Sequence, residues 1–403
     1  MTHLLVLAVP ILVAVLISNL RSNRATAPAK RTAKKPERRA PASFDAAAYG
    51  LVPREALDPR RPGPPAPERN RRRSQAVADA AWKGDWRPAA THVAAAGQDW
   101  DERWSRFELL REIARQDDGW LTAWREADPD DCDAAALEAD LMVHRAWAIR
   151  GGGYANEVPA ENMARFRALL PAAIEAAHRA ALLDPENPAP WVVLVTAARG
   201  AQYRPDRFQP LWEGLVARAP HHYEGHWQGM QYWCAKWYGT NGQMMRFAEQ
   251  AMDGAPPRSP LAGIYLHALS ELEGRGSGLP TGPAATARLA AVARALSAAR
   301  PEGGGPEDGG FENGGPEDGR FEDERLPVLR HLLAHYLGEA GMHAEALEQF
   351  RLLGRWCGAK VWADQGDPAE AFHAARAEAV LRSGARPLPP EQRAKNTDAA
   401  LHS

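Results

Sequence analysis

The 403-residue sequence predicts an all-α fold, a solenoid of stacked helical hairpins, from three observations. Between 74 and 385, stretches in which Val, Ile or Thr alternates with polar residues are nearly absent, and helix-favouring Ala, Leu, Arg and Glu predominate. Segments 134–150 and 171–184 place apolar residues three and four positions apart, so each would bury one side of a helix. The third observation is a repeat with a period of 36 residues.

The repeat is clearest where 191–226 is laid over 227–262. Trp191 then falls on Trp227, and each segment contains an Ala-Pro pair at the equivalent position. Each unit would begin with an aromatic helix, turn, continue in a second helix and stop at Ala-Pro, because proline pushes the preceding residue out of the α region. The sequence therefore predicts consecutive hairpins of similar length.

These hairpins resemble the tetratricopeptide repeat, a 34-residue helix pair. In 181–191 a helix would end at Asp-Pro and an aromatic opens the next unit, as in that family. Segment 329–350 is more similar still. When Arg330 is aligned with the fourth position of the repeat, the family's packing positions fall on Leu333, Ala334, Leu337, Ala346 and Phe350. The resemblance is degenerate, with a longer period and Val195 at a small position, and it covers about half the chain. It implies a concave surface for a peptide or partner helix. The pattern is also similar to bacterial repeat families, which implies no activity.

The first twenty residues predict a single membrane anchor. Residues 4–20 carry no charge, and as a helix they would span about 25 Å, the short end of the transmembrane range. Positive charge follows the apolar run, which places the folded region on the cytoplasmic side of the cell membrane. The small-residue triplet 25–27 leaves a cleaved signal peptide and an exported protein as an alternative. The basic residues that could also bind anionic lipid are Arg21, Arg24, Lys30, Arg31, Lys34 and Lys35.

Composition divides the rest of the chain. Residues 21–73 contain fifteen Lys/Arg against five Asp/Glu and many prolines, so we expect a disordered basic linker. Residues 74–385 form the expected helical domain, because all fourteen tryptophans lie between 82 and 362. Within it, 301–325 repeats a Gly/Pro/acid unit and is expected to be disordered, as is the tail 386–403.

Charge and cysteine content exclude several classes of function. The formal net charge is −2, and no basic patch interleaved with aromatics occurs in the helical region, so we expect no nucleic-acid binding. The three cysteines, Cys132, Cys234 and Cys357, form no CxxC pair and are odd in number. They are expected to be small buried hydrophobes rather than ligands or disulfides.

One segment, 219–239, could carry metal chemistry. His222 and His226 are four apart, Cys234 follows two turns later, and Glu224 could act as an acid or base. The HExxH pattern of metalloproteases is absent. We expect an aromatic core with surface histidines and no metal or cofactor instead, because an apolar helical stripe runs through the segment as Trp227, Met230, Cys234 and Trp237.

The sequence best predicts a membrane-anchored scaffold that faces the cytoplasm, binds a protein or peptide partner and performs no catalysis. No GxSxG motif and no P-loop is present. The alternative is a metal-dependent enzyme that uses His222, His226 and Cys234. Four aromatic residues lie off the main apolar stripe and are the predicted partner contacts: Tyr203, Tyr232, Trp233 and Tyr238.

Overall fold

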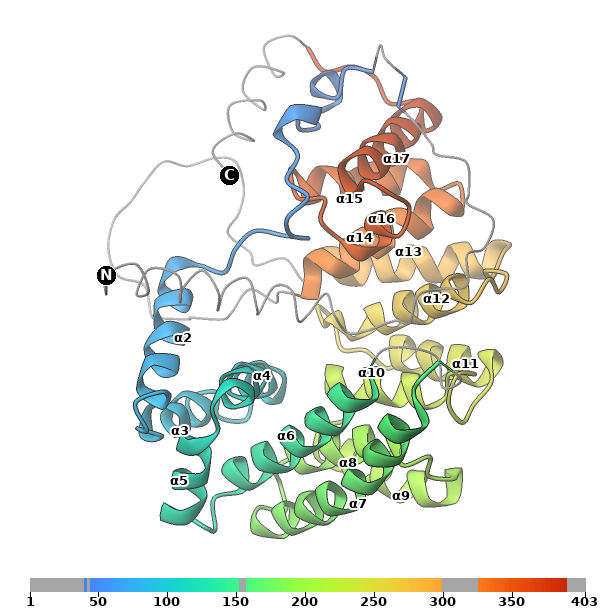
Figure 1. Ribbon diagram of the computed structural model, residues 1–403. Coiled ribbons are helices and arrows are strands. Elements are labelled where there is room, and N and C mark those ends of the chain that lie inside the picture. The colour runs from blue at the N-terminus through green and yellow to red at the C-terminus, as the bar shows by residue number, and fades with distance from the viewer. Residues whose placement is uncertain (1–39, 42–43, 152–156, 299–324, 390–403) are drawn as a thin grey trace. The chain divides into compact units, whose positions relative to one another are not determined.

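The computed structural model describes residues 40–41, 44–151, 157–298 and 325–389, and the regular secondary structure of these residues is all helical, as predicted (Figure 1). The only β-type pairing among them is an isolated parallel bridge between Asp58 and Trp356. The described chain divides into two compact units. Unit 1 comprises 67–251, and unit 2 comprises 252–389 together with the N-terminal residues up to 66.

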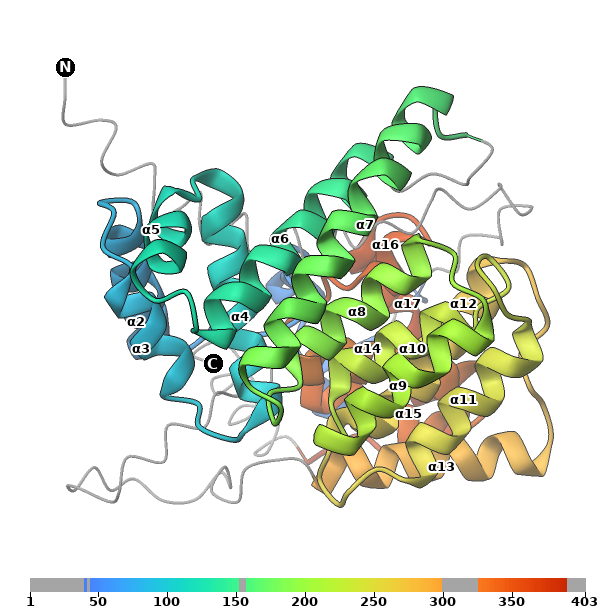
Figure 2. The same cartoon turned by 90° about the horizontal axis from the view of Figure 1, so that it is seen from below.

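Unit 1 is a succession of helices, and from α2 to α9 each helix packs on the next one in the chain. In Figure 2, α6, α7 and α8 lie side by side, and α8 also contacts α9 and α10. The last helix, α11, runs into the first residues of unit 2. The helices are α2 (Glu68–Ala81), α3 (Arg87–Ala94), α4 (Trp100–Gln116), α5 (Gly119–Ala127), α6 (Cys132–Arg150), α7 (Ala160–Leu183), α8 (Ala189–Gly200), α9 (Pro205–Arg218), α10 (Tyr223–Tyr232) and α11 (Asn241–Asp253).

Local capping chemistry explains where these helices begin and end. Asp131 accepts a hydrogen bond from the Ala134 amide at 2.8 Å and starts α6. Gly151, with φ 73°, ends it, and Pro159 precedes α7. Gly151 and Pro159 therefore separate two helices, although 152–156 lie outside the described residues.

The repeat predicted from 191 to 262 corresponds to two successive helix pairs, α8 with α9 and α10 with α11. The second helices begin 36 residues apart, at Pro205 and Asn241, and the first helices begin 34 residues apart, at Ala189 and Tyr223. The predicted apolar stripe is wrong beyond Tyr232, however, because α10 ends there and the chain turns over 233–240. A side chain at Gly239 would overlap the carbonyl of Trp233, so this tight turn requires glycine.

Unit 2 is also helical, with helices α12 (Ile264–Gly274), α13 (Pro283–Ala298), α14 (Arg325–Glu339), α15 (His343–Leu353), α16 (Lys360–Ala363) and α17 (Pro368–Ser383), and short 3₁₀ turns at Ala47–Tyr49, Arg54–Ala56 and Pro260–Gly263. Helix α15 packs on both α14 and α17. The residues that resemble tetratricopeptide packing positions, Leu333, Ala334, Leu337, Ala346 and Phe350, are all buried here. Burial suits any helical hairpin, so the resemblance itself stays a prediction.

The predicted disorder of 21–73 is wrong for the part that the structure describes. Residues 44–63, which we call the strap, lie along unit 2, and Leu51 and Val52 are buried there. Helix α2 begins at Glu68, inside the expected linker, because no proline lies within 68–81 and a proline is tolerated just before a helix. The residues before 40 lie outside the described chain.

Backbone and side-chain hydrogen bonds hold the strap. The Asp58 amide donates to the Arg355 carbonyl at 2.8 Å, and the Cys357 amide donates to the Asp58 carbonyl at 3.0 Å. The buried Arg376 donates from Nη1 to the Val52 carbonyl at 2.6 Å. These contacts join segments about three hundred positions apart in sequence, so no local pattern reveals them.

Several predicted segments lie outside the described residues: the anchor 4–20 with its basic flank, nearly all of the acidic insert 301–325, and most of the tail 386–403. Among the helices that are described, none combines the length and apolar character needed to cross a membrane. The three cysteines are buried, as expected.

Candidate functional site

The four predicted contact residues come together in unit 1, between the start of α9 and the turn after α10. The Tyr232 hydroxyl donates to the Tyr203 carbonyl at 2.7 Å. The ring of Tyr232 lies 5.0 Å from that of Trp233 and 6.0 Å from that of Tyr238, nearly parallel to the latter. Tyr232, Trp233 and Tyr238 thus form one aromatic cluster, which Tyr203 joins through its backbone carbonyl.

Exposure separates the members of this cluster. Tyr232 is fully buried and stacks on Phe208 with 3.6 Å between ring centroids, and burial raises the pKa of its hydroxyl. It supports the cluster and cannot touch a partner. Tyr238 is 41% exposed, and Tyr203 and Trp233 are partly exposed. The predicted contact set therefore retains three members with accessible rings.

A cation extends the exposed part of the cluster. The Arg207 guanidinium lies 3.9 Å from the centroid of the Tyr203 ring. Arg207 is exposed and forms no ion pair within the described residues. We call Tyr203, Arg207, Trp233 and Tyr238 the aromatic patch. Tyr, Trp and Arg are the residue types that most often dominate binding at protein interfaces.

The metal-site alternative finds no geometric support. His222 caps α10, its Nδ1 accepting from the Gly225 amide at 3.2 Å, and His226 Nδ1 lies 3.0 Å from the His222 carbonyl. Cys234 is buried in the following turn. In the described part of the chain, no three His, Cys, Asp or Glu side chains are grouped as metal ligands.

The expectation that these histidines lie at the surface is wrong. Both are buried, His222 against Trp104 and His226 against Trp212, with ring centroids 5.7 and 5.0 Å apart. Burial lowers the pKa of His226 to about 4. Capping and aromatic packing therefore account for both side chains. The hollow next to His222 admits about one water molecule and is too small for a substrate.

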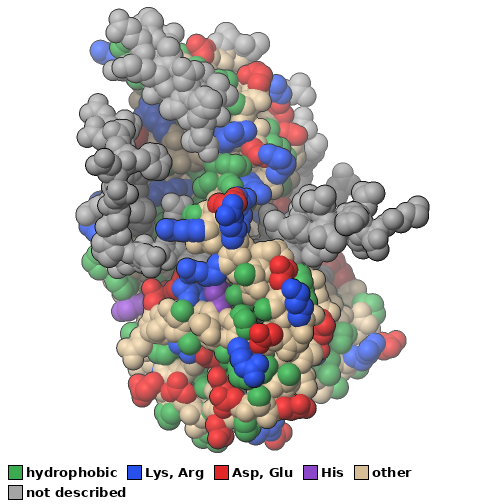
Figure 3. Space-filling view, turned by 90° about the vertical axis from the view of Figure 1, so that its left-hand side faces the viewer, with side chains coloured by type: hydrophobic (Ala, Val, Ile, Leu, Met, Phe, Trp, Pro, Cys, Tyr) green, Lys and Arg blue, Asp and Glu red, His purple; other side chains and the backbone are tan. Residues whose placement is uncertain are grey.

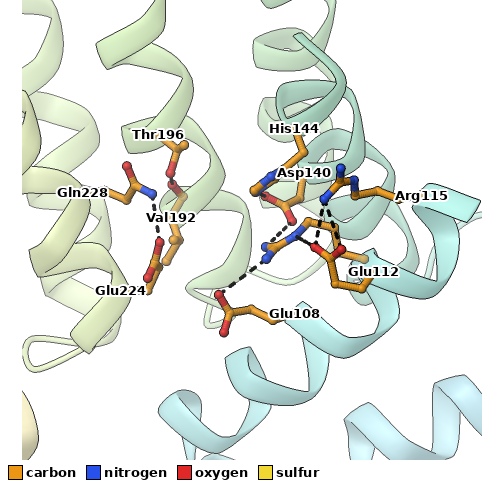
Figure 4. A network of polar contacts seen from close by, with 10 residues as sticks. Glu108, Glu112, Arg115, Asp140, His144, Val192, Thr196, Glu224 and Gln228 are labelled. Carbon is orange, nitrogen blue, oxygen red and sulfur yellow. Dashed lines mark hydrogen bonds and ion pairs between the residues drawn. The ribbon is translucent and has the colours of Figure 1, made fainter. Parts of the chain in front are cut away.

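A buried ionic network between α4 and α6 was not predicted from the sequence. Arg111 on α4 lies 3.1 Å from Asp140 on α6, and Glu108 and Glu112 flank the same guanidinium at 3.5 and 3.6 Å (Figure 4). His144, one turn beyond Asp140, approaches its carboxylate to 3.6 Å. The network links two helices whose other buried residues are mainly apolar.

Burial dominates the electrostatics of this network. It raises the pKa of Asp140 to about 6 despite the attraction of Arg111, and Glu108 and Glu224 add to the increase. Burial opposes the charge of Arg111, but the three facing carboxylates raise its pKa overall. Asp140 is 2% exposed, so the pair serves to hold α4 and α6 in register rather than to meet a ligand.

Helix α2 carries a basic face. The face of the molecule that includes α2, shown in Figure 3, has clustered Lys and Arg side chains. Glu68 pairs with Arg71 at 2.5 Å and with Arg72 at 2.9 Å, and no other acidic residue of α2 pairs with these arginines. The exposed arginines are Arg69, Arg71, Arg72 and Arg73. They continue the basic character of the preceding sequence onto an ordered helix.

Comparison with family models, with curated proteins and with solved structures finds no match to this chain. The functional argument therefore depends on the geometry of the chain itself.

Proposed function

We propose that this chain is a helical scaffold that binds a protein or peptide partner without catalysis, and that the aromatic patch of unit 1 is its contact surface. The observation that carries the proposal is the construction of the patch. Tyr238 is 41% exposed, yet it stacks on the buried Tyr232, which is fixed by Phe208 and by a hydrogen bond to the backbone. An exposed aromatic on a rigid base loses little entropy when a partner covers it.

The chemistry of the patch favours a particular kind of partner. The rings of Tyr203, Trp233 and Tyr238 offer apolar surface with polar edges. Arg207 adds a positive charge that no carboxylate among the described residues neutralises. A peptide with an apolar or aromatic side chain next to an acidic one would satisfy both features.

We further propose that residues 4–20 hold the scaffold at the cell membrane with the helical units in the cytoplasm. The basic residues from Arg21 to Lys35, continued by the arginines of α2, would then face anionic lipid, with about 1 kcal/mol for each charge near the surface. Fusion of a reporter that is active only outside the cytoplasm to residue 403 should give no signal. A strong signal would instead support export after cleavage.

Selection of peptides on the full chain tests the contact surface. We expect a random peptide library to yield binders in which an acidic residue neighbours an aromatic one. Tyr238→Ala should weaken the selected peptides at least about tenfold in titration calorimetry, because exposed aromatic anchors carry much of the binding energy. Leu182→Ala is the matched control, since Leu182 is 81% exposed on α7 of the same unit.

Two outcomes would contradict the proposal. One is a set of binders whose affinity is lowered as much by Leu182→Ala as by Tyr238→Ala. The other is a selection with no enrichment over the unselected library. Helical circular dichroism of each variant establishes that a loss of affinity is not a loss of fold.

A further inference from the structure

Two arginines and two tryptophans pack together in unit 1, and none of the four belongs to the aromatic patch. Trp147 and Arg150 occupy the last turn of α6, Arg199 lies at the end of α8, and Trp237 lies in the turn after α10. The two indole rings meet edge to face at 5.3 Å. Arg150 lies 5.5 Å from Trp147 and 5.1 Å from Trp237, and Arg199 lies 4.7 and 5.3 Å from the same rings.

Arg150 is placed as a buried cation without an acidic partner. Its side chain is 9% exposed, and its Nη1 donates to the Gly151 carbonyl at 2.9 Å. Its Nε is buried and has no hydrogen-bond acceptor in the part of the chain that the structure describes. No ion pair joins Arg150 to a described carboxylate, and burial lowers its pKa without an opposing charge. A buried charge of this kind carries a large desolvation cost unless something compensates it.

The N–H groups of the two indoles also lack hydrogen-bond acceptors among the described residues. These donors are the Nε1 of Trp147 and the Nε1 of Trp237, and both are buried. Buried indole N–H groups usually find a partner. One small region therefore contains three buried N–H donors in need of acceptors. A second guanidinium, that of Arg199, lies against the same rings.

We propose that this group, the Arg–Trp cage of Trp147, Arg150, Arg199 and Trp237, is a binding site for a small oxyanion of the phosphate or carboxylate type. The oxygen atoms of such an ion supply the acceptors that the cage lacks, and its charge compensates Arg150. A guanidinium is planar and presents parallel N–H groups that match the oxygens of either ion. Packing against two indoles fixes the orientation of that fork before the ion arrives.

Hydrogen phosphate offers more oxygen acceptors and more negative charge than acetate to Arg150 and to the buried N–H donors of the cage. At equal ionic strength the cage should therefore prefer hydrogen phosphate to acetate, and both to chloride, which lacks paired oxygens. Cation–π packing alone would stabilise the helices but would show no preference among these ions.

Titration calorimetry of the full chain with inorganic phosphate, acetate and chloride tests the site. We expect saturable binding of phosphate at one site. Arg150→Gln should abolish it, and Arg150→Lys, which keeps the charge but not the fork, should weaken it at least about tenfold. The matched control is Arg167→Gln, which removes one positive charge from an exposed position of α7 and should leave binding unchanged.

Each remaining outcome decides the question. Saturable binding of acetate without phosphate binding would assign the site to a carboxylate. Absence of binding for both, or equal effects of Arg150→Gln and Arg167→Gln, would overturn the proposal. If Arg150→Gln fails to fold, the affinity of the Arg150→Lys variant gives the answer. Tyr238→Ala should leave phosphate binding intact, so failure of this site is distinguishable from failure of the peptide surface.

Discussion

Replacement of Arg111 by methionine should lower the free energy of unfolding of unit 1 by about 3–5 kcal/mol at pH 8, the range expected when one partner of a buried ion pair is removed. Arg111 and Asp140 face each other at 3.1 Å, and Asp140 is 2% exposed. Without the guanidinium, the Asp140 carboxylate is buried with Glu108 and Glu112 nearby and no compensating cation at that position. Urea unfolding, with hydrogen exchange of the α4 and α6 amides, measures the loss.

The same variant should show a characteristic dependence on pH. Burial raises the pKa of Asp140 to about 6 even with Arg111 present, and removal of the cation raises this pKa further. Below that pKa the carboxyl binds a proton and no longer needs a counter-charge. The deficit of Arg111→Met should therefore be largest at pH 8 and shrink as the pH falls from the raised pKa of the variant toward about 6, where the parent carboxyl begins to take up a proton as well.

Two comparisons make this expectation specific. Arg115→Met changes a side chain that is one-third exposed and pairs only with Glu112 among the described residues, so its effect should stay below about 1 kcal/mol. The double variant Arg111→Met with Asp140→Leu should recover most of the loss, because both charges are then gone. A loss of stability in Arg111→Met no larger than that in Arg115→Met would show that the Arg111–Asp140 pair does not make this contribution to the free energy of unfolding.

Helix positions could be predicted from the sequence wherever the signal is local. The apolar pattern of 134–150 corresponds closely to α6, and Gly151 and Pro159 mark the break before α7 because each acts on its own backbone. One member of the buried ionic network, Asp140, also stands out in the sequence. Asp140 follows Leu137 by three positions and Ala136 by four, so it lies on the apolar side of its helix. A charge on that side indicates a buried partner, but not which one.

The strap and the exposure of the site residues could not be predicted, because both depend on distant contacts. Asp58 pairs with the backbone on both sides of Trp356, and the prolines around it are compatible with the extended chain that this pairing needs. The sequence identified Tyr232 as a contact residue since it lies off the apolar stripe. It is buried because Phe208, from another helix, covers it.

Acidification should destabilise unit 2 through His331. The expected loss is about 3 kcal/mol once the imidazole is protonated in the unfolded chain but is kept neutral by burial in the folded chain. The Nε2–H of His331 donates to the Pro62 carbonyl at 2.8 Å, and its Nδ1 accepts from the Trp362 indole at 2.8 Å. The neutral ring thus joins the strap to α16. A proton on Nδ1 would face the indole N–H and break that contact.

The direction of the effect follows from the pKa of each state. Burial lowers the pKa of His331 to about 4, from the usual 6.5. Below pH 6.5 the unfolded chain takes up a proton that the folded chain refuses, so stability is complete above pH 6.5 and falls as the pH drops toward 4. Burial also lowers the pKa of His373 to about 4, and this ring accepts from Arg376, which holds Val52 of the strap. Both histidines therefore act in the same direction.

Hydrogen exchange of residues 44–63 at pH 7 and pH 4.5 measures this loss where it begins. The strap amides should lose protection at pH 4.5 by a factor that corresponds to about 2–3 kcal/mol. In His331→Gln the amide can still donate to one partner and accept from the other but does not titrate, so part of the pH dependence should disappear. His343→Gln, at a partly exposed position of α15, should behave as the parent chain does. Equal loss of protection in the parent and in His331→Gln would show that this histidine does not link the strap to pH, because the contact it makes would then be indifferent to its proton.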